Sequence, residues 1–281
     1  MTEIKSKDNL LNFGPGLPAV RIGERINPTG KPKIQEIIMK GDLSFLVTLA
    51  REQEAAGANV LGVNVGMHGI DEKNLLVRAV QELEEITSLP LYIDSSQPEA
   101  LIAAREIYSY KPLVGSCTGE DISYKPLMDA FVDRPVALVV MLNDERGVSV
   151  KAEDRLEVAD RILAYADTVG FNKEDLVLDC MAMAVGAEPT AALECLKCIK
   201  ALSDQGLSTI IGLSNVSFGM PMRNVFNRTF VAMAVFAGLS AAILNPNTTE
   251  MIETVMAADV MTNRDPYAVN FLESYRTIFN P

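Results

Sequence analysis

The segment AVRIGER (19–25) is short and mostly apolar on both faces, and it sets the pattern on which the whole chain is built. Seven similar runs follow it, each rich in β-branched residues or leucine, as the strands of a buried parallel sheet are. These further strand candidates are NVLGVNV (59–65), PLYIDSS (90–96), PLVGSC (112–117), VALVVML (136–142), DLVLDC (175–180), STIIGLS (208–214) and SAAILN (240–245).

Amphipathic segments with apolar residues spaced near 3.6 lie between these runs and predict helices. The clearest are LSFLVTLAREQEAAG (43–57), EKNLLVRAVQELEEI (72–86), EDRLEVADRILAYADTVG (153–170) and PTAALECLKCIKALSDQG (189–206). Gly57, Gly170 and Gly206 end three of them, as helix stops do. Eight strand-then-helix units predict a closed α/β barrel, a (β/α)₈ TIM barrel, over residues 19–281. Residues 1–18 are expected to be an extension that lies across the barrel.

An open, doubly wound sheet is the alternative fold. Its G-x-G-x-x-G fingerprint would follow the first strand, and that fingerprint is missing here.

Composition narrows the class of protein. The chain has 281 residues, of which 48% are hydrophobic and 22% charged, so it can build a large core. The formal net charge of −12 argues against a nucleic-acid or anionic membrane surface. We find no signal peptide at the start and no apolar run long enough to cross a membrane. The four cysteines indicate reduced thiols of a cytoplasmic protein, and the pair Cys195 and Cys198 has the helical spacing of packing residues.

Polar residues follow nearly every predicted strand, where a barrel of this kind places its chemistry. Carboxylates and amides dominate the set. Its members are Glu24, Asn27, Asn64, Asp94, Asn143, Asp144, Glu145, Asp179, Asn215 and Asn245.

This set excludes several mechanisms. His68 is the only histidine, so neither a Ser-His-Asp triad nor a site with several histidine ligands can form. The chain has no G-x-x-x-x-G-K-[ST] motif for nucleotide phosphates, and none of its predicted strands contains a lysine suited to a Schiff base. Magnesium bound by carboxylates is a minority interpretation, because the carboxylates follow separate strands, and we predict no metal site.

A flat heterocycle rich in N–H donors suits what remains. An ionised carboxylate offers two parallel acceptors, which match an amino group beside a ring N–H. Asp94 and Asp179 would bind such an edge and would repel phosphates. Amide side chains both donate and accept, so they would read the ring carbonyl and nitrogen atoms.

The same segments resemble a known family. RIGERIN (21–27), GVNVG (62–66), YIDSS (92–96), LVLDC (176–180), GLSNVSFG (212–219) and NRTFVAMA (227–234) are similar to the pterin-binding barrel of methyltetrahydrofolate:corrinoid protein methyltransferases. The folate domain of cobalamin-dependent methionine synthase belongs to the same group. The resemblance runs from about residue 20 to the C-terminus, and GERIN together with GLSNVS is its most specific part.

The resemblance implies roles for particular residues. Asp94 and Asp179 would hold the pterin ring, and Asn215 would approach N5, the atom that carries the methyl group. Asn215 would stabilise the protonated N5, and Asp179 or a water would complete the relay, which makes Asn215 and Asp179 the expected catalytic residues. Gly212 and Ser214 belong to the same loop, Asn64 lies beside the pocket, and Asp144 matches a D-E-x-G motif of the methionine synthase branch.

One position departs from the family. Where the corrinoid/iron–sulfur branch has a pterin-binding asparagine after the fourth strand, this chain reads VGSCTGED, with Gly115 at that point. The missing contact would be made by Ser116, by a water or by Asn143. The difference favours a branch in which methyl groups pass from a corrinoid to tetrahydrofolate.

The resemblance therefore implies an enzyme that transfers a methyl group between N5 of tetrahydrofolate and the cobalt of a corrinoid. The D-x-H-x-x-G motif of a corrinoid-binding module is missing, so cobalamin or another corrinoid would be carried by a separate partner protein. Family members pair through barrel helices, which implies a homodimer.

Two alternatives are related to this function. A dihydropteroate synthase would carry S-R-K after the seventh strand and R-x-H after the last, where this chain has SNVSFG and LNPNTTE. Arg223 and Arg228 are the only cations nearby, and Arg228 is expected to brace the loop from a helix. A non-catalytic pterin-binding subunit would not need Asn215.

Overall fold

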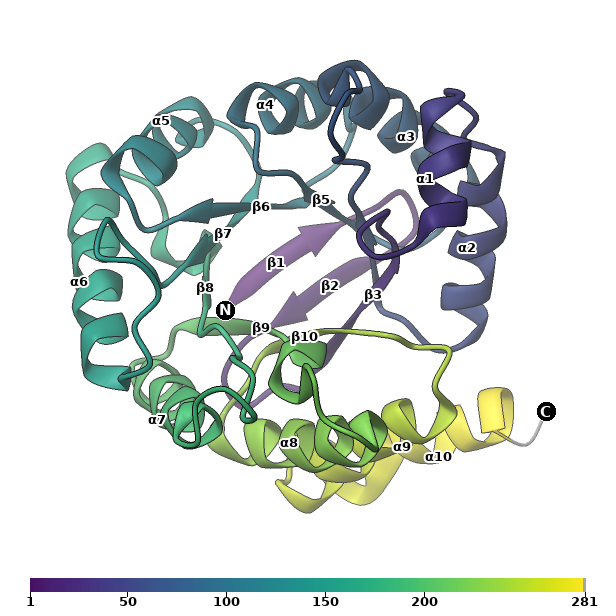
Figure 1. Ribbon diagram of the computed structural model, residues 1–281. Coiled ribbons are helices and arrows are strands. Elements are labelled where there is room, and N and C mark those ends of the chain that lie inside the picture. The colour runs from purple at the N-terminus through teal and green to yellow at the C-terminus, as the bar shows by residue number, and fades with distance from the viewer. Residues whose placement is uncertain (280–281) are drawn as a thin grey trace.

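The computed structural model describes residues 1–279, and its centre is a closed barrel of eight parallel strands (Figure 1). The strands follow one another around the barrel in chain order, and the last pairs with the first. The predicted (β/α)₈ barrel is thereby confirmed, and each expected strand is present. The strands are β3 Val20–Ile26, β4 Val60–Val63, β5 Leu91–Asp94, β6 Leu113–Thr118, β7 Ala137–Met141, β8 Leu176–Asp179, β9 Ser208–Gly212 and β10 Ala241–Leu244.

Helices surround the barrel on the outside, as Figure 1 shows. Gly57, Gly170 and Gly206 follow helices with φ of 92°, 78° and 81°, a left-handed conformation that glycine adopts without strain. No helix of the described residues combines the length and apolar composition that crossing a bilayer requires. The helices are α1 Pro32–Met39, α2 Ser44–Ala55, α3 Glu72–Ile86, α4 Pro98–Ile107, α5 Asp121–Phe131, α6 Ala152–Val169, α7 Ala191–Asp204, α8 Arg223–Ala237, α9 Thr249–Met261 and α10 Val269–Ser274.

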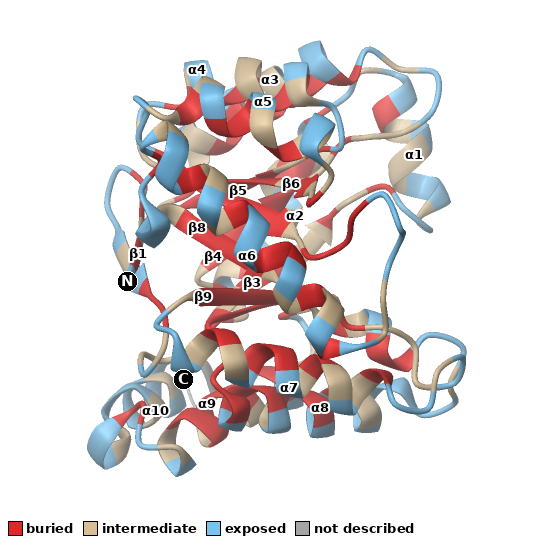
Figure 2. Cartoon of the chain, turned by 90° about the vertical axis from the view of Figure 1, so that its left-hand side faces the viewer, coloured by how far each residue is buried: buried red, intermediate tan, exposed pale blue. Residues whose placement is uncertain are grey.

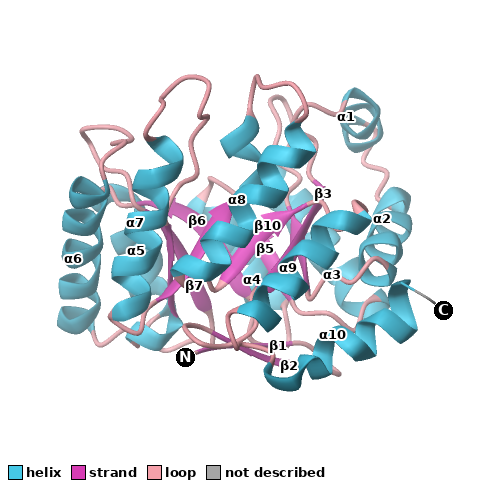
Figure 3. Cartoon of the chain, turned by 90° about the horizontal axis from the view of Figure 1, so that it is seen from below, coloured by secondary structure: helices cyan, strands magenta, loops and turns pink. Residues whose placement is uncertain are grey.

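A β-hairpin closes the amino-terminal end of the barrel. Its strands, β1 Thr2–Lys5 and β2 Leu10–Phe13, lie below the barrel in Figure 3. Ile4 and Phe13 are fully buried against residues that point into the barrel. The Thr2 hydroxyl donates to the carbonyl of Glu174 at 2.7 Å, and the amide of Lys5 donates to the carbonyl of Lys111 at 2.7 Å. Full burial of such apolar side chains contributes about 1.5–3 kcal/mol each, so the hairpin is anchored to the barrel.

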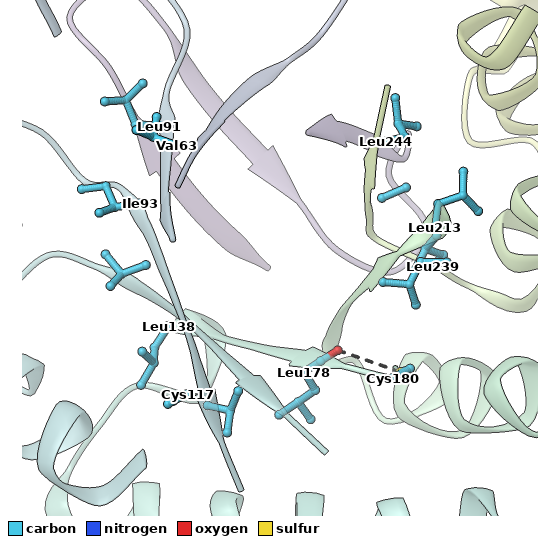
Figure 4. Close-up of a cluster of buried hydrophobic side chains, with 14 of the residues drawn as sticks. Val63, Leu91, Ile93, Cys117, Leu138, Leu178, Cys180, Leu213, Leu239 and Leu244 are labelled. Carbon is cyan, nitrogen blue, oxygen red and sulfur yellow. Dashed lines mark hydrogen bonds between the residues drawn. The ribbon is translucent and has the colours of Figure 1, made fainter. Parts of the chain in front are cut away.

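The hydrophobic core has two parts, which the alternation of side chains along each strand separates. One part fills the barrel interior and includes Val20, Val139 and Ile210. The larger part lies between the strands and the helices, where Figure 2 shows buried residues on the inner faces of the helices. Figure 4 shows a portion of this layer, with Leu138 and Leu178 among its members.

All four cysteines are buried and unpaired. Cys195 and Cys198 lie on the inner face of α7 within the larger core. Their expected role as packing residues is confirmed.

Candidate active site

The carboxyl ends of the strands meet at the end of the barrel opposite the hairpin, which we call the mouth. Asp94 and Asp179 are the last residues of β5 and β8, and each follows three buried apolar residues of its strand. Because all eight strands are parallel, residues at their carboxyl ends gather at one mouth. Of the other residues predicted for the site, Ser116 lies within β6 near its carboxyl end. The rest lie at or just beyond the strand ends, namely Asn64, Asp144, Gly212, Ser214 and Asn215.

Asp94 is surrounded by hydrogen-bonding groups. The Asn64 amide donates to Asp94 Oδ2 at 2.9 Å. The hydroxyls of Tyr92 and Ser116 each lie 3.4 Å from Asp94 Oδ1 and 3.1 Å from one another. Burial raises the pKa of Asp94, although the bonds from Asn64, Ser116 and Tyr92 oppose that rise. The structure therefore brings Asn64, Ser116 and Asp94 together, and it adds Tyr92, which sequence reasoning did not single out.

The backbone at Gly115 lies too close to the next strand to carry a side chain. A Cβ there would approach the Cβ of Val139 to 2.7 Å and its carbonyl oxygen to 3.0 Å. An asparagine cannot occupy this position without moving β7. Of the two residues considered as its replacement, Ser116 is the one that contacts Asp94.

Asp179 lies half-buried beneath the loop that follows β8. Its Oδ1 accepts a hydrogen bond of 2.7 Å from the backbone amide of Met181, which has a positive φ of 55°. Burial raises the pKa of Asp179 to about 6; the Met181 amide and the charge of Arg155 oppose the rise, while Asp94 adds to it. Two interacting carboxyl groups thus face the mouth, and in their ionised form they favour a ligand with several N–H donors.

The loop after β9 holds Ser214 and Asn215 in a 3₁₀ turn, Leu213–Ser217. A Cβ at Gly212 would lie 3.1 Å from the Asn215 amide nitrogen, so the absence of a side chain at Gly212 leaves room for that amide. The Ser214 hydroxyl donates to Glu24 Oε2 at 3.4 Å. Burial raises the pKa of Glu24, whereas Lys31 and Ser214 lower it. Asn215, the residue after Ser214, is exposed at the mouth.

Arg223, at the start of α8, braces this loop. Its guanidinium donates to the Ser214 carbonyl at 2.7 Å and to the Ser217 hydroxyl at 3.0 Å. The expectation that Arg228 plays this part was wrong, because Arg228 lies further along α8 and donates to the Thr254 hydroxyl of α9 at 3.3 Å.

Asp144 has a different environment from the other predicted residues. Its buried carboxylate accepts bonds from the guanidinium groups of Arg146 and Arg161, both with Oδ2 at 2.9 Å. The hydrogen bonds from Arg146 lower its pKa. The structure shows no contact between Asp144 and Asp94 or Asp179 within the described residues, so its predicted part in binding the ring stays a prediction that these ion pairs do not favour.

At the carboxyl ends of β6 and β7, two buried polar atoms have no hydrogen-bond partner among the described residues. They are Oγ1 of Thr118, at the end of β6, and Oδ1 of Asn143, just after β7. Unpaired buried polar atoms are rare and cost free energy, so a ligand or water is expected to satisfy them. Asn143 could be found from the sequence as a polar residue after a strand, whereas Thr118 gave no such signal.

No group of three or more His, Cys, Asp or Glu side chains within residues 1–279 has a metal-binding arrangement. His68 is exposed in a loop after β4.

Known proteins are similar to this chain in sequence and in fold. The family model described as "Pterin binding enzyme" matches residues 23–245. The chain is 27% identical over 259 residues to a methylcorrinoid:tetrahydrofolate methyltransferase of Eubacterium limosum, covering 91% of this chain and 95% of that protein. It is also 27% identical over 259 residues to methionine synthase of Mycobacterium leprae, where the match covers 86% of this chain but 21% of that much longer protein.

Solved structures share the fold. Dihydropteroate synthase from Xanthomonas albilineans in complex with 7,8-dihydropteroate superposes with a TM-score of 0.66 at 17% identity, covering 93% of this chain and 98% of that one. The 7,8-dihydropteroate synthase of Vibrio fischeri gives a TM-score of 0.67 at 13% identity, with 95% and 100% covered. At such identities the likeness concerns the fold, but the family model covers most of the chain. The chain therefore belongs to the pterin binding enzyme family.

Proposed function

We propose that this protein is a methyltransferase that moves a methyl group between N5 of tetrahydrofolate and the cobalt of a corrinoid held by a separate protein. The observation that carries the proposal is the pair of carboxylates, Asp94 and Asp179, at two strand ends of one mouth in a pterin binding enzyme. Similarity to a methylcorrinoid:tetrahydrofolate methyltransferase over nearly the whole length of both chains supports the reaction type and favours the direction toward tetrahydrofolate.

The two aspartates would bind the amino group and ring N–H of the pterin. Both keep acceptor capacity for this: Asp179 receives one bond from Met181, and the hydroxyls near Asp94 Oδ1 are at the long distance of 3.4 Å. Asn64 and Ser116 would hold Asp94 in place. The unpartnered Thr118 Oγ1 and Asn143 Oδ1 offer further acceptors for ring donors.

The loop after β9 would act at the reacting nitrogen. In the proposed direction, N5 attacks the methyl carbon, the carbon–cobalt bond breaks with its electron pair left on cobalt, and N5 loses its proton. We propose that the Asn215 amide stabilises the charge that develops on N5, and that Asp179 completes the path by which the proton leaves. Gly212 gives that amide room, and Arg223 holds the turn through the Ser214 carbonyl, so the turn that carries Asn215 is in place before the reaction begins.

Partners can be proposed from exposed apolar residues. Phe218 and Met222 follow the Asn215 turn and are exposed at the mouth, where a corrinoid protein would approach.

An apolar groove lies between α7 and α8 on the outside of the barrel, with Leu196, Met233 and Phe236 along it. We propose that this groove pairs two copies of the chain into a homodimer.

The cations near the mouth do not favour dihydropteroate synthesis. That reaction needs cations for a diphosphate, whereas the guanidinium of Arg223 is engaged with Ser214 and Ser217, and Arg228 with Thr254.

Anaerobic calorimetry with tetrahydrofolate tests the site. We expect saturable binding by the wild-type protein and a loss of about tenfold or more in affinity for Asp94→Asn and Asp179→Asn, since a hydrogen bond to a charged group contributes about 1.5–3 kcal/mol. Asp133→Asn, at an exposed carboxylate between the end of α5 and β7, is the matched control. A folded wild-type protein that does not bind tetrahydrofolate would refute the folate site.

Transfer itself is tested separately. Methylcobalamin and tetrahydrofolate are mixed with the protein, and the absorbance change that accompanies loss of the methyl group from cobalt is followed. If tetrahydrofolate binds but accepts no methyl group, either from free methylcobalamin or from a methylated corrinoid protein, the function left is that of a non-catalytic pterin-binding subunit.

A further inference from the structure

Arg155 of α6 is fully buried, with 0% of its surface exposed. A charged side chain in the interior is stable only when opposite charge or several acceptors surround it. Among the described residues, Arg155 makes no ion pair at salt-bridge distance, so its guanidinium depends on hydrogen bonds and on the field of more distant carboxylates.

The hydrogen bonds of Arg155 join two loops of the mouth, the one after β7 and the one after β8, which begins directly after Asp179. Arg155 Nε donates to the carbonyl of Ser149, in the loop between β7 and α6, at 2.8 Å. Arg155 Nη1 donates to the carbonyl of Cys180, the residue directly after Asp179, at 2.5 Å. Its Nη2 lies 3.2 Å from the sulfur of Met183 in the loop between β8 and α7. One side chain thus fixes the backbone on which Asp179 is mounted.

The other titratable groups around Asp179 are acids, so none of them supplies positive charge. Asp94 and Tyr92 face it from β5, Cys195 from α7 and Cys180 from its own loop. Arg155 is the one cation whose charge acts on Asp179 within the described part of the chain, and it counteracts the effect of burial on the pKa of that carboxyl.

We propose that Arg155 is a positioning residue of the site, which fixes the loop after Asp179 through its buried hydrogen bonds and supplies positive charge to the surroundings of that carboxyl. Because a pterin edge that donates N–H bonds needs a carboxylate, the consequence for ligand binding rests on the proposed function. The effect of Arg155 on Asp179 in the empty protein does not.

Two substitutions separate the charge from the hydrogen bonds. Arg155→Met removes the charge and keeps an unbranched side chain. Arg155→Lys keeps the charge but replaces the fork of donors with a single ammonium group. If Arg155→Met does not fold, Arg155→Gln takes its place, because it also lacks the charge and retains amide donors.

The first measurement uses the ligand-free protein. The Asp179 carboxyl is titrated by ¹³C NMR, with Asp179→Asn to assign its signal. The pKa of Asp179 in the wild-type protein is expected to be about 6. It should rise by about one unit or more in Arg155→Met or Arg155→Gln and change little in Arg155→Lys. An unchanged midpoint in the charge-removing variants would overturn the electrostatic role.

The second measurement follows tetrahydrofolate affinity between about pH 5.5 and 8.5. A rise of about one unit in the pKa of Asp179 should weaken binding about eightfold near pH 5.5 and about twofold near neutral pH, in addition to the pH-independent loss from the missing hydrogen bonds. It should have little effect at the alkaline end, where Asp179 is ionised in both proteins. A loss that is equal at every pH would show a purely structural role and overturn the proposal. Arg155→Lys should lose affinity about equally at every pH, and wild-type affinity in this variant would refute the role of the hydrogen bonds.

The two measurements separate the failures. If neither the wild-type protein nor any Arg155 variant binds tetrahydrofolate, while the titration midpoint of Asp179 moves as expected, the proposed function fails and the inference about Arg155 stands.

Discussion

Replacement of Asp179 by asparagine should make the folded protein more stable at neutral pH while it weakens tetrahydrofolate binding. The carboxyl has its ordinary pKa of 3.8 in the unfolded chain and a pKa of about 6 in the folded protein, chiefly because of burial. Below about pH 4 the group is protonated in both states and affects stability little. As pH rises through the folded pKa, the folded protein loses the stability that this proton provided.

The size of the effect follows from the shift. A difference of about two pKa units corresponds to about 3 kcal/mol in the free energy of unfolding, which wild type loses between about pH 4 and pH 7. Asparagine does not titrate, and its side-chain oxygen can still accept the Met181 amide bond. The stability of Asp179→Asn relative to wild type should therefore rise by up to about 3 kcal/mol across that window.

Urea unfolding at a series of pH values measures this difference directly. Asp133→Asn, at an exposed position, is the control and should track wild type at every pH. If the stability difference between Asp179→Asn and wild type were the same at about pH 4.5 and about pH 7.5, burial of the Asp179 charge would not be the dominant influence on that carboxyl.

Three other substitutions have distinct expected outcomes. Asn215→Ala should slow methyl transfer about 100-fold and change the Kd for tetrahydrofolate less than about threefold, as stopped-flow absorbance and calorimetry would show; equal losses in both would mean that the amide serves binding. Gly115→Asn should lower the free energy of unfolding by about 1–3 kcal/mol in urea, because its Cβ meets Val139; an unaltered midpoint would show that β6 and β7 can separate. Asp144→Asn should destabilise the protein by about 1–3 kcal/mol, since its arginine partners lose a buried carboxylate, yet leave the tetrahydrofolate Kd unchanged; loss of binding would return Asp144 to the pterin contacts.

The strands and the location of the site could be predicted because both depend on local pattern. A short apolar run buried on two faces, such as DLVLDC (175–180), has few alternatives to a barrel strand, and a polar residue at its end lies at the mouth by topology alone.

Contacts between distant segments could not be predicted in the same way. Asp144 is part of a motif that suggested a ligand contact, but Arg161 reaches it from the next helix, seventeen residues away. Arg228 and Arg223 lie on the same helix, and only the direction of the helix decides which of them meets the Ser214 carbonyl. Arg155 occurs in a segment with ordinary helical spacing, and nothing in that spacing indicates that its guanidinium is buried.

The hairpin beneath the barrel ties the first residues of the chain to its second half. Thr2 bonds with Glu174 and Ser208, more than 170 residues away in sequence, so the hairpin cannot dock until β8 and β9 have been synthesised. During translation, Ile4 and Phe13 must therefore wait in an exposed state while most of the barrel emerges from the ribosome. The same placement puts the exposed amino terminus at the end of the barrel away from the mouth, so a tether attached there would hold the protein on a sensor surface with its mouth facing solution.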